Sequence, residues 1–163
     1  MTTWRALDAG RVCDIMTVWE AAPWPMSRTE TLEYGVNTFG WEVGTDEDRE
    51  FLRNTDDNVP DDYVSIIAGE EDPTGQIYFR VTDTIREITD ESLTWLRDQL
   101  TLLIREGTTR WGKPKLITLK SGNRVAKWDL PGGARIAFSE TQRAVAADFI
   151  TPNYADVLRQ LGE

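Results

Sequence analysis

The stretch Arg124–Ile150, RVAKWDLPGGARIAFSETQRAVAADFI, decides the fold class of this 163-residue chain. Turn sequences, Pro-Gly-Gly and Glu-Thr-Gln, divide it into three short apolar runs: Arg124–Leu130, Ala134–Ser139 and Arg143–Ile150. A further run, Leu116–Lys120, precedes them across Ser-Gly-Asn. Ala126, Trp128 and Leu130 alternate onto one face of their run, as expected for a strand with one buried side. These runs predict an antiparallel meander.

Upstream of the meander, the sequence predicts two helices and then a hairpin. Asp8 caps a first helix whose apolar stripe contains Val12, Ile15, Met16 and Trp19. Ser27-Arg-Thr-Glu30 is a capping box that opens a second helix, and Gly40 ends it. Two β-branched and aromatic runs then predict the hairpin strands: Tyr63–Ala68 and Gln76–Thr82.

The remaining segments complete the order of elements. Residues 42–62 lack a sustained apolar period, so we expect mostly loop there, with a short turn of helix over 49–53. A long helix begins at Thr89–Ser92 and is expected to end at Gly107, and Thr151-Pro152 opens a short closing helix. The predicted order is α-α-β-β-α-β-β-β-β-α over one domain, residues 1–163. This order favours an α+β fold with helices covering an antiparallel sheet.

The composition excludes most catalytic designs. The chain has no histidine and one cysteine, so it lacks the usual general base, the commonest zinc ligand and any CxxC pair. No glycine loop opens into a helix, and the acidic run has no EF-hand register. We expect no catalytic residues, no metal and no cofactor. Cys13 lies on the apolar side of the first helix and is expected in the core rather than as a reactive thiol.

The net charge of −10 disfavours binding to nucleic acid or to anionic membranes, because phosphate groups would be repelled. No apolar run approaches the ~20 residues of a membrane span, the N-terminus has no signal-peptide run, and the single cysteine suits a reducing compartment. We therefore expect a cytoplasmic protein.

Charge is polarised along the chain. Residues 42–72 carry twelve acids and two arginines, whereas residues 105–127 carry seven basic residues and one acid. One interpretation is two solubilising surfaces that partly neutralise each other in the fold. The other is an acidic docking surface for a basic partner, with aromatic anchors. The candidate partner-binding residues are Trp41, Asp46, Asp48, Glu50, Phe51, Asp56, Asp57, Asp61 and Asp62.

Several motifs resemble a family of small actinobacterial proteins, the domain-of-unknown-function family 6301. They are the opening Thr3–Gly10 before a helix with Trp19, Phe39-Gly-Trp41, Gly112-Lys-Pro, Val125–Gly133 and Thr151-Pro152. The resemblance covers almost the whole chain. It implies an immunity or antitoxin role, similar in outline to the immunity factor of a mycobacterial NAD-degrading glycohydrolase toxin, and it implies no catalytic residue.

The leading hypothesis is therefore a non-catalytic immunity protein that occludes the active-site cleft of a cognate toxin, with an NAD-glycohydrolase as one candidate target. Two alternatives stay open: a secretion-type chaperone that binds an extended client segment, and an acidic nucleic-acid mimic that inhibits a nuclease. An enzyme of its own comes last. The sequence leaves the oligomeric state open.

Overall fold

A computed structural model describes residues 3–55, 61–69 and 72–163. The helices are α1 (Ala9–Glu20), α2 (Arg28–Phe39), α3 (Asp90–Trp111) and α4 (Pro152–Gln160). The first group of strands is β1 (Glu42–Asp46), β2 (Arg49–Arg53), β3 (Tyr63–Ile67) and β4 (Gln76–Arg80). The second group is β5 (Lys115–Thr118), β6 (Arg124–Asp129), β7 (Arg135–Glu140) and β8 (Val145–Ile150).

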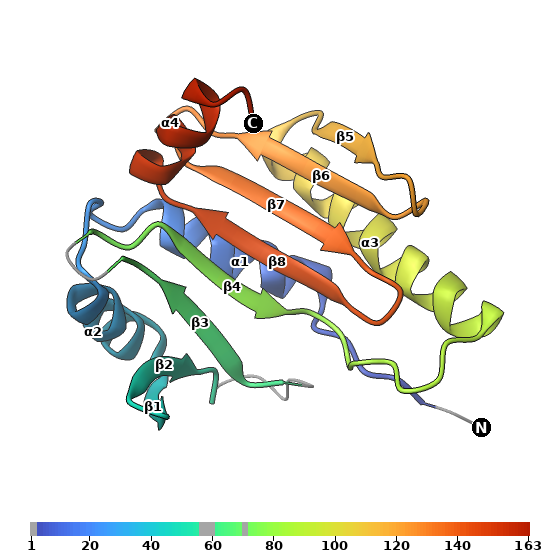
Figure 1. Ribbon diagram of the computed structural model, residues 1–163, viewed down its shortest axis with the longest axis horizontal. Coiled ribbons are helices and arrows are strands. Elements are labelled where there is room, and N and C mark those ends of the chain that lie inside the picture. The colour runs from blue at the N-terminus through green and yellow to red at the C-terminus, as the bar shows by residue number, and fades with distance from the viewer. Residues whose placement is uncertain (1–2, 56–60, 70–71) are drawn as a thin grey trace.

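The strands form one antiparallel sheet in the order β1-β2-β3-β4-β8-β7-β6-β5. Each group is a meander, and the two join where β4 pairs with β8, with Tyr78 opposite Asp148. Figure 1 shows this single twisted layer, with β1 and β2 at one end and β5 at the other. The predicted α+β fold class is confirmed.

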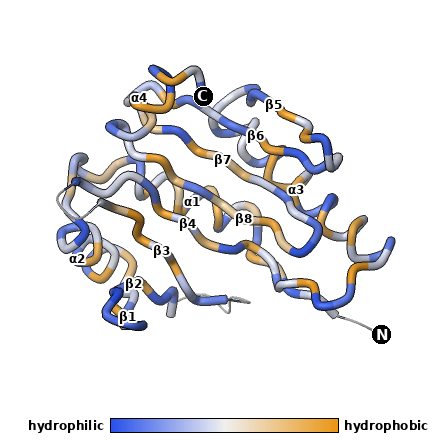
Figure 2. Tube along the Cα trace, in the orientation of Figure 1, coloured by the Kyte–Doolittle hydropathy of each residue, from blue (hydrophilic) through white to orange (hydrophobic). Residues whose placement is uncertain are grey.

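The hydrophobic core lies between the sheet and three helices. α3 packs on β7 and β8, α1 packs on α3 and β8, and α2 packs on β1, β2 and β3. The inward residues of neighbouring strands are fully buried, among them Phe79, Phe138 and Phe149. Figure 2 shows the apolar stretches of β3, β4, β7 and β8 running side by side. Aromatic rings fill the space under α2, where Trp19 contacts Phe39 and Trp41.

The expectation of a loop over residues 42–62 is wrong for its first half. β1 and β2 form a hairpin whose register runs from Glu42 opposite Arg53 to Asp46 opposite Arg49. The connection is the two-residue turn Glu47-Asp48, and both residues have positive φ (46° and 67°). A tight hairpin turn of this kind needs positive φ at both positions. Asn-Gly or Asp-Gly is the usual sequence signal for such a turn, and it is absent here.

The expected end of the long helix at Gly107 is also wrong. α3 continues to Trp111, and Gly112 with φ 88° follows as its C-cap. Gly107 serves packing instead, because a Cβ at this position would lie 2.7 Å from ring atoms of Trp128. Trp111 ends the helix and meets Trp128 edge-to-face.

Candidate partner-binding surface

The acidic hairpin, which we define as residues 42–53, projects from one end of the sheet. Its core contact is Leu52, which is fully buried beneath α2. The close approach of α2 depends on Gly35, whose missing side chain leaves room for a methyl group of Leu52 only 2.4 Å from the ideal Cβ position. The acidic hairpin is therefore attached to the core by the buried Leu52 side chain, and its charged side chains are exposed to solvent.

The predicted acids differ in whether the fold neutralises them. Asp62 pairs with Arg53 at 3.0 Å, and Asp61 pairs with Arg80 at 3.2 Å. Asp46, Asp48 and Glu50 are exposed, and none of them has an ion-pair partner among the residues that the structure describes. The unneutralised charge is thus concentrated on the hairpin. Asp56 and Asp57 lie outside the described residues.

Of the two predicted aromatic anchors, one is buried and the other is partly exposed. Trp41 is only 2% exposed and stacks on Phe39 with ring centroids 4.1 Å apart, so the prediction of Trp41 as a surface anchor is wrong. The cause is its position directly after α2, where the chain turns into β1 beneath Trp19. Phe51 is half-buried and stacks on Tyr63 with centroids 3.9 Å apart. It stays accessible beside the acids.

A groove lies between the hairpin and β3. β2 pairs with β3 only through Leu52 and Arg53, so the two strands diverge beyond this point. The space between them measures about 860 Å³ and its lining includes Arg28, Asp48, Glu50, Phe51, Ser65 and Ile67. We call this space the edge groove. At this groove, the Arg28 guanidinium of α2 donates a hydrogen bond to the Glu50 carbonyl of β2 at 3.2 Å.

A more apolar hollow of about 570 Å³ adjoins the edge groove on the side of α4. The two share the chain from Ile67 to Gly69 and Asp72. Ile67 is 47% exposed, and Tyr154 and Val157 of α4 are 39% and 48% exposed. The hairpin, the groove and this hollow therefore form a continuous surface in which exposed apolar groups lie next to carboxylates, as in the centre and rim of protein interfaces.

The acidic and basic segments lie at opposite ends of the sheet. Residues 42–72 supply β1, β2 and β3, whereas residues 105–127 supply the end of α3, β5 and most of β6. No ion pair between described residues joins the two segments. The fold therefore does not bring them together to neutralise each other, and the polarity of the sequence becomes a polarity in space.

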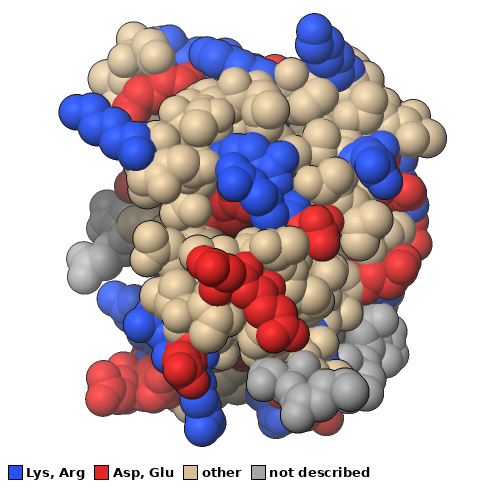
Figure 3. Space-filling view, turned by 90° about the vertical axis from the view of Figure 1, so that its right-hand side faces the viewer, with Lys and Arg blue, Asp and Glu red and all other residues tan. Residues whose placement is uncertain are grey.

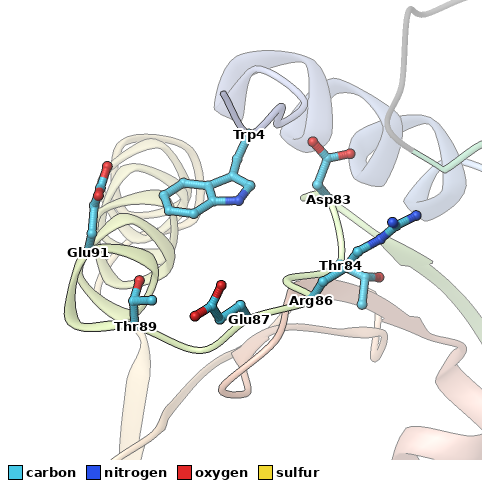
Figure 4. A pocket seen from close by; sticks show the side chains of 7 residues that line it. All are labelled: Trp4, Asp83, Thr84, Arg86, Glu87, Thr89 and Glu91. Atoms are coloured by element: carbon cyan, nitrogen blue, oxygen red, sulfur yellow. The ribbon is translucent and has the colours of Figure 1, made fainter. Parts of the chain in front are cut away.

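A second pocket, which the sequence does not predict, lies at the end of the molecule where α3 begins. It measures about 520 Å³. Figure 4 shows the indole of Trp4 and the carboxylate of Glu87 facing the same hollow, with Arg86 turned away. Trp4 also contacts Trp95, with centroids 5.4 Å apart. The sequence signal was the acidic run from Asp83 to Glu91, which counts of charge over longer segments obscure.

The charge around this second pocket is mixed. Asp83, which lines it, is already paired with Arg5 at 3.4 Å. Figure 3 views this side of the molecule and shows basic side chains near the middle of the face with acidic ones around and below them. A strongly basic partner is therefore matched better by the acidic hairpin than by this pocket.

The Cys13 thiol is buried and remains protonated at neutral pH. Burial raises the pKa of the Cys13 thiol to about 12, against a smaller lowering by Arg110 and further raising by Glu106, Asp14 and Asp8. The thiol is fully buried, which confirms its prediction as a core residue. Within the described ranges, no group of three or more acidic or cysteine side chains is arranged to hold a metal ion, and no helix is long and apolar enough to cross a membrane.

Comparison with known proteins identifies the family but no characterised relative. No curated protein and no solved structure shows significant similarity to the chain. Residues 10–151, from the start of α1 to the end of β8, match the family of unknown function DUF6301. This match covers every strand of the sheet and all residues that line the edge groove, so the chain belongs to the family DUF6301.

Proposed function

We propose that this protein is a non-catalytic immunity protein of actinobacterial type that acts in the cytoplasm by binding a cognate toxin and covering its active-site cleft. An enzyme that degrades NAD is one candidate toxin. The partner is expected to present a basic cleft or a basic rim to the acidic hairpin. The single observation that carries the proposal is that Asp46, Asp48 and Glu50 project from the hairpin without an ion-pair partner among described residues.

This observation favours binding because unpaired like charges do not stabilise the chain that carries them. Four carboxylates, including Glu47, lie within five consecutive positions of the hairpin, with Arg49 as the only cation between them. Mutual repulsion raises the energy of the free protein, and a basic partner relieves it. Concentrated charge also accelerates encounter with an oppositely charged cleft. Phe51 and Ile67 supply apolar contact area beside the acids.

The hairpin turn supports the same role. Glu47 has φ 46°, a conformation that residues other than glycine rarely adopt, and Asp48 follows with φ 67°. The tight turn between β1 and β2 requires these φ values, and it places the Glu47 and Asp48 carboxylates at the tip of the hairpin. Glycine at these positions would relieve the backbone and remove two carboxylates at the tip.

The test pairs the purified protein with the toxin domain encoded by the neighbouring open reading frame. The triple variant Asp46→Asn/Asp48→Asn/Glu50→Gln keeps side-chain size and removes three charges. We expect it to bind the folded toxin about 10- to 100-fold more weakly in titration calorimetry, as when several interfacial charge pairs are lost. Growth rescue on co-expression should weaken in parallel.

The matched control is Glu87→Gln/Glu91→Gln/Asp98→Asn, which removes the same charge from the end of the molecule that carries the second pocket. We expect this control to bind like the wild type. Unchanged affinity of the hairpin variant would remove the acidic hairpin from the interface, and loss in the control alone would move the interface to the second pocket. A toxin domain that the wild-type protein neither binds nor inhibits would overturn the immunity role.

A secretion-type chaperone is the second candidate, and the incomplete pairing of β3 in the edge groove favours it. A chaperone binds an unfolded client segment, whereas an immunity protein requires the folded toxin. Titration with the same toxin in folded and in denatured, diluted form separates the two.

A further inference from the structure

The edge of β3 that lines the edge groove is an open strand edge inside the sheet. Tyr63 and Val64 pair with β2 on this side, but no described strand pairs with Ser65, Ile66 or Ile67 there. On the opposite side these three residues pair fully with β4. The last residues of β3 are therefore paired with a neighbouring strand on one side only, although β3 is third in the strand order and not at the outer edge of the sheet.

The direction of the main-chain groups follows from the ladder. Asn54 N–H donates to the Asp62 carbonyl at 2.8 Å, so the main chain of residue 62 faces the β2 side. Alternation along an antiparallel strand gives the same direction to residues 64 and 66. Ala68, the residue directly after β3, lines the same groove. Consistently, the Ile67 carbonyl faces the other side, where it accepts from Gly75 N–H at 2.9 Å. The main-chain groups of Ile66 thus point into the edge groove, which Ala68 also lines.

These groups are available for pairing. The Ala68 N–H has no hydrogen-bond partner among the residues that the structure describes. The described β2–β3 ladder ends at Val64, so it does not pair Ile66 across the groove. An exposed strand edge with free main-chain groups is a template for another strand. The true outer edges differ because they carry charge: Glu42 and Asp46 on β1, Lys115 on β5. The β3 edge carries Ser65-Ile-Ile-Ala68 instead.

The walls of the edge groove specify the chemistry of the incoming strand. Phe51 and Ile67 lie on the face of the sheet opposite the core and offer an apolar surface to alternate side chains. The charged side chains of the lining are three carboxylates, Asp48, Glu50 and Asp72, and two arginines, Arg28 and Arg49. The Arg28 guanidinium is held at the Glu50 carbonyl, and no described ion pair neutralises any of the three carboxylates. An extended segment with alternating apolar and basic residues matches both features.

We propose that the edge groove binds an extended basic segment of the protein partner as an additional strand on β3, hydrogen-bonded to Ile66 and Ala68. Four residues, Ser65–Ala68, provide about 13 Å of open edge at the usual strand rise. Main-chain pairing provides affinity in such strand addition, and pockets for alternate side chains provide specificity. The inference deepens the proposed function in that it names the partner's contacting segment, but it requires only that the partner be a polypeptide.

The test uses a synthetic ten-residue peptide of alternating lysine and valine as the probe and the ¹⁵N-labelled full chain as the receptor. We expect chemical-shift changes confined to the hairpin and β3, and hydrogen exchange of the Ile66 and Ala68 amides slowed by about tenfold or more. The same peptide with glutamate in place of lysine should bind about tenfold more weakly or worse, because the groove rim is acidic.

Two controls separate strand addition from loose electrostatic binding. Methylation of alternate peptide nitrogens on the pairing side removes the main-chain donors and should abolish binding while keeping every charge. Ile67→Ser changes one exposed side chain of the groove wall and should weaken binding of the lysine–valine peptide by about fivefold or more. Ala68→Pro, which deletes the Ala68 N–H, should also abolish it.

Retained binding of the methylated peptide, or shift changes elsewhere with none at Ile66 and Ala68, would overturn the proposal. A dimer of the free protein in light scattering with these two amides already protected would also overturn it, since a second copy would then occupy the edge. Failure of toxin neutralisation with intact peptide binding would count against the immunity role alone. Toxin neutralisation without peptide binding would count against strand addition alone.

Discussion

Asp148 lies near the middle of the sheet, on the face opposite α1, α2 and α3, between Tyr78 of β4 and Ala137 of β7. Burial raises the pKa of its carboxyl group, and the Gln76 side-chain amide, which donates to it, only partly offsets this effect. Its cross-strand neighbour Ala137 and its strand neighbour Ala146 are themselves nearly buried. A charged carboxylate at this position therefore costs stability that the fold recovers elsewhere.

Asp148→Asn should stabilise the protein at neutral pH, because asparagine keeps the hydrogen bond from Gln76 without the desolvated charge. The raised pKa means that the folded state holds its proton more tightly than the unfolded chain. The free energy of unfolding therefore falls as pH rises from the ordinary carboxyl pKa to the raised one, and its loss is complete above that. Thermal melts of both proteins across pH 3–8 test this, with the gain largest at high pH. An equal gain at all pH values would contradict it.

Gly107 decides how α3 meets the sheet. Alanine normally stabilises a helix by about 1 kcal/mol relative to glycine. Here a methyl group would lie 2.7 Å from the Trp128 ring, which is 2% exposed and held by its indole N–H donating to the Gly112 carbonyl at 2.7 Å. We expect Gly107→Ala to lower the free energy of unfolding by about 1–3 kcal/mol, as in other overpacked cores. Denaturant melts measure this difference.

The neighbouring Thr108→Ala, on the exposed side of the same helix, is the control and should stay within about 0.5 kcal/mol of the wild type. In a Trp128→Phe background, which removes the clashing ring atoms, the cost of Gly107→Ala should shrink. A stabilising Gly107→Ala in the wild-type background would show that Trp128 moves aside freely.

Gly107 illustrates why some elements could be predicted from the sequence and others could not. Helices with capping boxes at Ser27 and Thr89, and strands with turn sequences between them, were predictable because each depends on neighbours in sequence. The end of α3 was not predictable, because Gly107 is required by the packing of Trp128, which lies in a distant part of the sequence, and not by a helix end. The β1–β2 hairpin was missed for a related reason. Its turn lacks glycine, and only Leu52 is buried in it, so tertiary contact with α2 rather than alternation specifies its strands.

The acidic charge of the candidate surface could be predicted from the sequence, but the three-dimensional form of the surface could not. Exposed Asp46, Asp48 and Glu50 follow from composition, whereas the burial of Trp41 and the opening of the edge groove depend on how α2 and β3 meet the hairpin. At the scale of the whole molecule, the acidic and basic ends of the sheet are separated by its full width (Figure 1). Charge separated in this way accelerates encounter with an oppositely charged partner and disfavours partners of like charge.

Salt should therefore affect the wild type and the hairpin variant differently. If repulsion among the hairpin acids destabilises the free protein, Asp46→Asn/Asp48→Asn/Glu50→Gln should melt about 2–4 °C higher than the wild type at low ionic strength, which corresponds to about 1 kcal/mol for a chain of this size. This difference should vanish near 0.5 M NaCl, because salt at this concentration limits the repulsion between exposed charges to a few ångströms. The control Glu87→Gln/Glu91→Gln/Asp98→Asn should not gain, because Glu91 lies in the first turn of α3 and stabilises the helix dipole. A hairpin variant that melts below the wild type at every salt concentration would show that these carboxylates stabilise the fold, and it would remove the reason for assigning them to a partner.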